Sequence, residues 1–294
     1  MRTAPTYNVN PQPSVACFGE ALWDVLPGGL FPGGAPLNVA YHLRRQGMPV
    51  RLLSAVGRDF LGDELLRRLT AWGVTTTTVA RLPRRPTGTV CAEINANGAA
   101  SYTIGQAVAW DRIPVPAGLA RSTPPSAIVF GTLALREKPN RATFDTLLNA
   151  WPAALRVLDL NLRPPFATPE TVHFAVRRAH LLKLNEDELG TITRRRLRGP
   201  GDIERAARVL GDTHAIERIC VTAGAAGAGL LWDGEWLWEP ARRVKVQDTV
   251  GAGDAFLASL LSASLRNIAP RKALAAACRM GEFVASKPGP TPEY

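Results

Sequence analysis

The stretch DTVGAGDAF, residues 248–256, places an aspartate directly after Gly-Ala-Gly and directly before an apolar pattern. Downstream of Gly253, apolar side chains recur at helical spacing, at Phe256, Leu257, Leu260, Leu261, Leu265 and Ile268. This spacing predicts a helix that begins near Ala252. The first turn of a helix carries free N–H groups and the positive end of the helix dipole, and glycines let an anion approach the backbone closely. The stretch is therefore predicted to bind a phosphate group.

The carboxylate of Asp254 has two interpretations at this position. It could stabilise the start of the helix, or it could act as a general base beside the bound phosphate. The residues by themselves leave both open. The turn is not an ordinary P-loop, because the chain has no G-x-x-x-x-G-K-[ST] motif, and Phe256 occupies the last place of a G-x-G-x-x-G pattern.

Outward from this turn, short apolar and β-branched segments alternate with helical patterns. The candidate strands are residues 15–20, 49–56, 126–131, 155–161, 179–185 and 218–224. Helical patterns lie at 35–47 and 61–74, and each contains a glycine suited to a helix C-terminus. The alternation predicts an α/β fold with a mostly parallel central sheet flanked by helices.

One segment interrupts the alternation. Residues 86–104 are predicted to form two strands around Asn97-Gly98, a residue pair typical of hairpin turns. A hairpin inserted into an α/β chain often covers a pocket, so we expect a small β lid here. The alternative is an edge extension of the main sheet.

Charge and composition exclude several classes of function. The 294 residues carry a net charge of +10, and 30 of the 35 basic residues are arginines in scattered pairs such as Arg44 and Arg45. The densest basic cluster, residues 194–198, has no interleaved aromatic residues for base stacking. The scatter indicates a compositional bias and a general attraction for anionic substrates, and we expect no nucleic-acid partner.

We expect neither a targeting segment nor a functional cysteine pair in this chain. No apolar run reaches the roughly 18 residues of a membrane helix, and residues 1–14 lack the apolar core of a signal peptide. We therefore expect a cytoplasmic protein without membrane contact, with a flexible N-terminal arm at 1–14 and a single domain over 15–294. The cysteines are far apart and predict neither a disulfide nor a zinc site; they are Cys17, Cys91, Cys220 and Cys278.

Three stretches together resemble the ribokinase-type PfkB family of carbohydrate kinases: DTVGAGDAF, FPGGAPLNVAYHLRRQG at 31–47 and GRDFLGDELLRRLTAWGV at 57–74. The resemblance runs from about Val15 to Pro292. Within the family, GEALWDVLP at 19–27 and DLNLRP at 159–164 resemble the fructokinase branch. The resemblance implies a ribokinase-like sandwich whose small β lid is built from inserted segments at about 17–35 and 86–108.

The resemblance also implies a reaction. Asp254 would remove the proton from a sugar hydroxyl, while the N–H groups of Gly251, Ala252 and Gly253 hold the γ-phosphoryl oxygens of ATP. The implied activity is ATP-dependent phosphorylation of a primary hydroxyl, with fructose giving fructose 6-phosphate. A 2-keto-3-deoxygluconate kinase and a ribokinase-type kinase are the alternatives within this class. From a different class, a non-catalytic sugar sensor would keep the pocket without the chemistry.

By the same resemblance, the sugar-binding residues are Asp24, Gly33, Gly34 and Asn38. A carboxylate and an amide can together accept from and donate to neighbouring hydroxyls. Without the family, Asp24 could equally be a turn residue before Pro27.

The stretch DLNLRP suggests a further contact with the substrate. In an extended segment, alternate side chains point the same way, so Asp159, Asn161 and Arg163 could share a face at the end of a strand. Arg163 would then meet sugar hydroxyls, a phosphate, or the carboxylate of a sugar acid.

Asn185 and Glu188 match the family's N-x-x-E motif, which orders Mg²⁺ and phosphates, usually through water. The alternative, compatible with this role, is a capping box, because Asn followed three residues later by Glu is typical of a helix start.

Thr222, Gly224 and Gly227 follow a predicted strand, and the resemblance makes them the floor of the ATP site. A tight turn is the alternative. The family's late A-N-A-x-G-A pattern is not kept here, where Ala276, Arg279 and Met280 stand at the Asn, Gly and Ala positions.

Relatives often bind K⁺ near the position of Asp248, and a loop-end carboxylate that accepts from nearby N–H groups is the alternative. By analogy with relatives, we also expect a homodimer formed through the lid strands.

Overall fold

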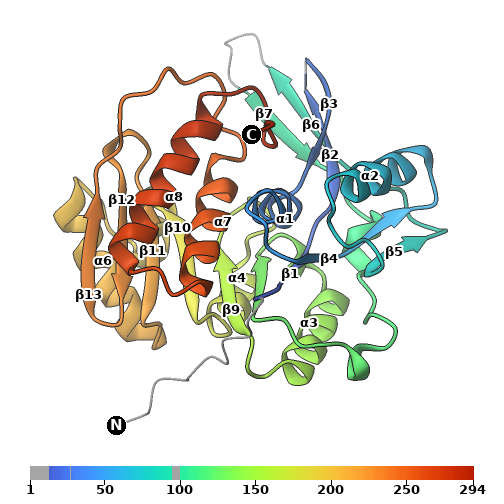
Figure 1. Ribbon diagram of the computed structural model, residues 1–294, viewed down its shortest axis with the longest axis horizontal. Helices are drawn as coiled ribbons and strands as arrows, with labels where there is room; N and C mark the ends of the chain where they lie inside the picture. The colour runs from blue at the N-terminus through green and yellow to red at the C-terminus, as the bar shows by residue number, and fades with distance from the viewer. Residues whose placement is uncertain (1–12, 27, 95–99) are drawn as a thin grey trace.

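The computed structural model describes residues 13–26, 28–94 and 100–294 (Figure 1). Most of the predicted N-terminal arm, and the predicted turn at Asn97 and Gly98, lie outside the described residues.

The centre of the described chain is a nine-stranded sheet with the order β13-β12-β11-β10-β9-β8-β1-β4-β5. Every neighbouring pair is parallel except β11–β12 and β12–β13. The six strands predicted from the sequence are all present. The strands are β1 (Val15–Phe18), β4 (Val50–Gly57), β5 (Val79–Leu82), β8 (Ala127–Gly131), β9 (Leu155–Asp159), β10 (Leu181–Asn185), β11 (Arg218–Thr222), β12 (Ala228–Trp232) and β13 (Glu235–Glu239).

Helices cover both faces of this sheet, as the alternating pattern predicts. One face packs against α1 (Ala35–Arg45), α2 (Phe60–Ala71), α7 (Ala252–Leu265) and α8 (Pro270–Ala285). The other packs against α3 (Lys138–Ala150), α4 (Pro169–Val176), α5 (Glu186–Thr193) and α6 (Pro200–His214). Within the described residues, no helix combines the length and the apolarity that a membrane span requires.

Alternation along the strands explains why both faces are apolar. In β1, Val15 and Cys17 belong to the core beneath α1 and α2, whereas Ala16 and Phe18 belong to the core on the opposite face. A strand buried on both sides is apolar at every position, which is typical of parallel sheets. The four cysteines are free, and all except Cys91 are buried.

A second, four-stranded sheet has the order β3-β2-β6-β7. Three residues, Gly19 to Ala21, join β1 of the central sheet to β2 of the small one. The hairpin of β6 and β7 pairs with β2 in this small sheet and not with an edge of the central sheet. In Figure 1 the small sheet lies above α1. Its strands are β2 (Leu22–Leu26), β3 (Gly29–Gly33), β6 (Gly88–Ile94) and β7 (Ala100–Ile104).

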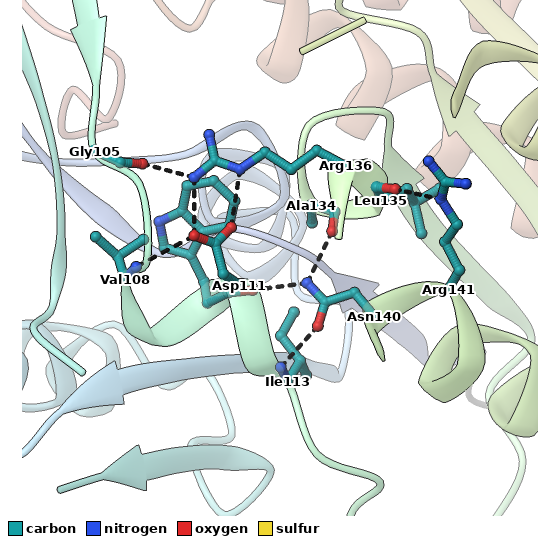
Figure 2. Close-up of polar contacts among 10 residues, drawn as sticks. Gly105, Val108, Asp111, Ile113, Ala134, Leu135, Arg136, Asn140 and Arg141 are labelled. Atoms are coloured by element: carbon teal, nitrogen blue, oxygen red, sulfur yellow. Dashed lines mark hydrogen bonds and ion pairs between the residues drawn. The ribbon is translucent and has the colours of Figure 1, made fainter. Parts of the chain in front are cut away.

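A buried arginine fastens the end of this small sheet to the central domain (Figure 2). Arg136 donates to the backbone oxygen of Gly105, which directly follows β7, at 2.6 Å. It also binds both carboxylate oxygens of Asp111, at 2.9 and 3.0 Å. The guanidinium lies between the rings of Trp110 and Phe166. Because charge-assisted bidentate pairs have a defined geometry, this contact fixes the position of the chain where it leaves β7.

Candidate active site

The strand order places a ligand-binding edge at β1. Strand numbering runs in opposite directions on the two sides of β1, with β8 and β9 on one side and β4 and β5 on the other. In open α/β sheets, ligands bind beyond the carboxyl ends of the strands at such a switch point. The chain leaves β1 there and enters the small sheet, so the two sheets meet at this edge.

The glycine turn leads into α7, as predicted. Gly251 is the N-cap residue with a φ of 77°, a left-handed conformation that glycine adopts without strain. A Cβ at this position would lie 2.6 Å from Cα of Pro290, so the turn also requires a residue without a side chain. Among the residues that the structure describes, no side chain forms a capping hydrogen bond at this helix start. Asp254 therefore does not act as the hydrogen-bonding cap of α7.

The carboxylate of Asp254 points to another helix instead. Its Oδ2 accepts a hydrogen bond of 2.8 Å from Nδ2 of Asn38 in α1. The pKa of Asp254 is raised to about 6, mainly by burial and also by the nearby carboxylate of Asp159, although Lys183 and the bond from Asn38 lower it. A carboxylate with a pKa near 6 is ionised at neutral pH and can still accept a proton effectively.

The backbone of the turn offers two free donors. The N–H of Ala252 donates to the carbonyl of Thr249 at 3.2 Å, so it is already occupied. Within the described part of the chain, the N–H groups of Gly251 and Gly253 have no such acceptor. The phosphate-binding capacity of the turn therefore rests on these two glycines.

A buried lysine, which the sequence analysis did not identify, lies against this turn. Lys183 Nζ is 3.0 and 3.1 Å from the two carboxylate oxygens of Asp159, and it is 2.9 Å from the place where a Cβ on Gly253 would stand. Burial by itself lowers the pKa of Lys183, but the carboxylates of Asp159 and Asp254 outweigh this and hold it above its ordinary value. The ammonium is thus charged and adjacent to the predicted phosphate. A single lysine within the apolar strand LLKLN was the signal for it.

Asp24 lies in strand β2, so the interpretation as a turn residue is wrong. Its side chain covers Gly33 on the neighbouring strand, where a Cβ would stand 2.1 Å from Oδ2. Burial and the charge of Asp254 raise the pKa of Asp24 to about 6, while Arg163 lowers it. Asp24, Asp254 and Arg163 are therefore close enough to influence one another, as the predicted sugar site requires.

Asp159, Asn161 and Arg163 were expected to share one face because they alternate along a strand, and the structure shows that this reasoning is wrong. Strand β9 ends at Asp159, and Asn161 has a φ of 43°, so the segment is no longer extended. Strand alternation does not apply beyond that point. Asp159 and Arg163 nevertheless both act on the pKa of Asp254, Asp159 by raising it and Arg163 by lowering it.

Asn185 and Glu188 form the capping box of α5. Asn185 Oδ1 accepts from the N–H of Glu188 at 2.8 Å, and Glu188 Oε2 accepts from the N–H of Asn185 at 2.9 Å. The other oxygen, Oε1, accepts from the N–H of Leu162 at 2.7 Å. Each carboxylate oxygen keeps a second lone pair, so Glu188 can still accept from a metal-bound water. The donor set thus suits water-mediated binding of Mg²⁺ better than direct coordination.

Thr222 ends β11 and pairs with Asn185 at the end of β10 in the parallel register. The glycines that follow form a short turn, and Gly224 has a φ of 50°. A Cβ on Gly227 would stand 2.2 Å from the backbone oxygen of Glu239. The tight-turn interpretation is therefore correct for the local structure, and the turn lies at the same sheet edge as Asn185.

Both carboxylate oxygens of Asp248 accept hydrogen bonds from backbone N–H groups. Oδ1 accepts from Val250 at 3.0 Å and Oδ2 from Gly289 at 3.2 Å. This is the alternative that the sequence offered, and it ties the chain after α8 to the glycine turn. The remaining lone pairs leave room for a K⁺ contact.

A second missed residue is Glu20, which is 2% exposed. It lies in the link between β1 and β2, and its Oε1 accepts from the N–H of Ala35 at 3.3 Å. The signal in the sequence was a carboxylate directly after the apolar run VACFG.

Comparison with known proteins adds to this geometry. The family model described as pfkB family carbohydrate kinase matches residues 14–293. A fructokinase from Rhizobium leguminosarum bv. trifolii is 32% identical over 265 residues, which cover 84% of this chain and 78% of the relative.

Solved structures share the fold. A double mutant of the fructokinase from Vibrio cholerae O395, in its fructose-, ADP- and potassium-bound form, superposes with a TM-score of 0.81 at 23% identity, covering 95% of this chain and 94% of that one. The fructokinase from Xylella fastidiosa with bound ATP has a TM-score of 0.79 at 22% identity, covering 94% and 93%.

Proposed function

Because the chain belongs to the pfkB family of carbohydrate kinases, we propose that it transfers the γ-phosphoryl group of ATP to a primary hydroxyl of fructose, giving fructose 6-phosphate. The observation that carries this proposal is the position of the Asp254 carboxylate. It lies in the first turn of α7, beside free glycine N–H groups and the ammonium of Lys183.

Asp254 acts as the general base. Its hydrogen bond from Asn38 orients the carboxylate, and its pKa of about 6 leaves it ionised at neutral pH. A positioned base of this kind contributes about 10²–10⁴-fold to a rate. The proton of the sugar hydroxyl moves to a carboxylate oxygen of Asp254 as the hydroxyl oxygen attacks phosphorus, and ADP leaves.

The glycine turn and Lys183 stabilise the transferring group. In a loose phosphoryl-transfer transition state, charge spreads over the equatorial oxygens, so fixed donors stabilise it without covalent chemistry. Gly251 and Gly253 supply N–H groups, and Lys183 supplies a positive charge that Asp159 holds in place.

Asn185 and Glu188 would hold a Mg²⁺ ion through water, together with the phosphates of ATP. When bound, the ion neutralises charge on the phosphate oxygens. Thr222, Gly224 and Gly227 would form the floor beneath the nucleotide, at the same edge of the sheet as Asn185. Asp248 would contribute to a K⁺ site, as the potassium-bound neighbour structure suggests.

Fructose is favoured over a sugar acid by the charges around Arg163. Three carboxylates, those of Asp24, Glu20 and Asp254, lie within electrostatic range of this one guanidinium. A substrate carboxylate would add a further negative charge to the group. A neutral sugar with hydroxyls that donate to Asp24 and accept from Asn38 and Arg163 fits better.

A coupled assay of ADP formation across fructose, 2-keto-3-deoxygluconate, ribose and adenosine tests the substrate. Fructose should give the highest kcat/KM. A higher kcat/KM for another sugar would replace fructose and leave the kinase assignment intact. Calorimetric sugar binding without ADP formation would instead support the sugar sensor. Homodimerisation through the small sheet stays an expectation, which sedimentation analysis can check.

A further inference from the structure

Glu20 lies where the two sheets meet, in the three-residue link between β1 and β2. The link packs closely on the start of α1. A Cβ on Gly34, the N-cap residue of α1, would stand 2.5 Å from the backbone oxygen of Glu20 and 3.2 Å from its Cγ. The side chain of Glu20 therefore runs directly along the first turn of α1.

One carboxylate oxygen of Glu20 binds that turn, and the other has no partner. Oε1 accepts from the N–H of Ala35, the first residue of α1. Among the described residues, no hydrogen-bond donor reaches Oε2, although this atom is buried. The amide oxygen of Asn38 is likewise buried without a partner. Buried acceptors without donors are rare in native structures and call for an explanation.

The electrostatic surroundings connect Glu20 to the reaction. The pKa of Glu20 is raised to about 7, mainly by burial, although the backbone N–H groups of Glu20 and Ala35 lower it. Among the charged side chains, Asp254 raises this pKa and Arg163 lowers it. A carboxylate buried with so little compensation lowers stability. Such groups are often found at functional sites.

We propose that Glu20 is a positioning residue for the phosphoryl transfer: its carboxylate fixes the first turn of α1, and through this turn it holds Asn38 against the base Asp254. The connection is short. Gly34 and Ala35 form the start of the helix, the carbonyl of Gly34 accepts from the N–H of Asn38 at 2.9 Å, and the Asn38 amide donates to Asp254.

The charge of Glu20 has little influence on the titration of Asp254. The pKa of Glu20 is raised to about 7 and that of Asp254 to about 6, so Glu20 is mostly neutral where Asp254 takes up its proton. Position and charge can be separated by substitution. Glu20→Gln keeps an oxygen that accepts from Ala35 and removes the charge, while Glu20→Asp keeps the charge on a side chain too short to reach Ala35 in the same geometry. This inference rests on the proposed role of Asp254.

The test measures kcat and KM for fructose and ATP between pH 5 and pH 9 in wild type, Glu20→Gln, Glu20→Asp and Glu20→Ala. Glu20→Gln keeps the acceptor for Ala35, so we expect a kcat and a KM within about threefold of wild type and an unmoved acid limb. Glu20→Asp and Glu20→Ala lose that contact, so kcat should fall by about tenfold. Their acid limb should move to higher pH, because the bond from Asn38 that lowers the pKa of Asp254 is weakened.

Asp111→Asn is the matched control, because Asp111 is a similarly buried carboxylate that pairs with Arg136 and takes no part in the site (Figure 2). Assayed below its unfolding temperature, it should keep the wild-type acid limb. Wild-type kcat and an unmoved acid limb in all Glu20 variants would overturn the proposal. So would a raised KM for fructose with unchanged kcat, since that pattern indicates uniform substrate binding.

A measurement without substrate separates this inference from the proposed function. Since the pKa of Glu20 is higher in the folded than in the unfolded chain, wild type loses stability as the pH rises from about 5 to about 8. Glu20→Gln lacks this loss, so its unfolding free energy should improve relative to wild type over that range. If the difference in unfolding free energy between Glu20→Gln and wild type stays constant over this pH range, the inference is overturned, even if fructose is phosphorylated. Failure of wild type to phosphorylate any sugar would overturn the proposed function, whatever the unfolding data show.

Discussion

The amide of Asn38 donates a hydrogen bond of 2.8 Å to the carboxylate of Asp254, across 216 positions of sequence. Asn38 lies in α1 and Asp254 in the first turn of α7, so the bond joins the two helices that begin at the ligand-binding edge. The hydrogen bond keeps the carboxylate of Asp254 in one orientation beside the glycine turn. Five expected outcomes follow from the arrangement of the site.

Replacing Asp254 by Asn should abolish most turnover without unfolding the protein. The amide is nearly isosteric, but it cannot accept the proton, so kcat should fall by about 10²–10⁴-fold. Steady-state ADP formation measures kcat, and circular dichroism and the unfolding temperature check the fold. Turnover close to wild type would remove Asp254 from the role of base.

The pH dependence of kcat should show one acid limb. The pKa of Asp254 is raised to about 6, so the carboxyl is protonated and unable to accept a proton below that pH. We expect kcat to fall as the pH drops through about 6 and to reach a plateau above about 7. Because Asp24 has a similar pKa, the measured value belongs to the coupled group.

Asn38→Ala checks this assignment of the acid limb. The bond from Asn38 lowers the pKa of Asp254, so its removal should move the limb to higher pH. A kcat that is flat down to pH 5 in wild type would contradict both expectations.

Substitutions in the ion pair of Lys183 and Asp159 should affect the stability of the fold and the activity differently. Lys183→Met leaves Asp159 buried without its partner, which should destabilise the fold by about 3–5 kcal/mol. The double variant Lys183→Met with Asp159→Leu should recover most of that stability, because an apolar pair of similar volume avoids the buried charge. We expect its activity to stay low, since no ammonium reaches the phosphoryl group. Chemical denaturation and kcat measured on the same three proteins provide the comparison, and recovery of kcat in the double variant would contradict the role of Lys183.

Glu188→Gln should raise the Mg²⁺ requirement. The amide keeps one oxygen for a backbone N–H but loses the negative charge that favours a hydrated cation. We expect a higher half-saturating Mg²⁺ concentration and a loss of stability of about 1 kcal/mol from the unpaired N–H. A titration of activity with Mg²⁺ at saturating ATP measures the first effect. An unchanged Mg²⁺ dependence would confine Glu188 to the capping box.

The order of secondary structure and the glycine turn follow from local sequence. The runs at 15–20 and 218–224 contain the strands β1 (Val15–Phe18) and β11 (Arg218–Thr222), because a segment buried on both faces must be largely apolar. Helix α7 begins at Ala252 because a glycine ends the preceding turn and helical spacing follows. Such features depend only on residues that are neighbours in the chain.

Local sequence did not determine that the small sheet is separate from the central one. The hairpin of β6 and β7 pairs with β2, which lies more than sixty residues earlier, and strand pairing between distant segments leaves little trace in a single sequence. The expected alternation of Asp159 and Arg163 was wrong for a related reason. A single left-handed residue, Asn161, changes the direction of the chain.

The sequence by itself determined the α/β class, the helix that begins after Gly251 and the presence of a carboxylate at its start. Only the tertiary structure decided that Asn38, Lys183 and Glu20 surround that carboxylate and its turn. The physical reason is the distance along the chain between the residues that determine each feature. Helix and strand periodicity arise from backbone geometry over a few residues, whereas the pKa of a buried acid depends on charges and donors that the folded chain brings within a few ångströms.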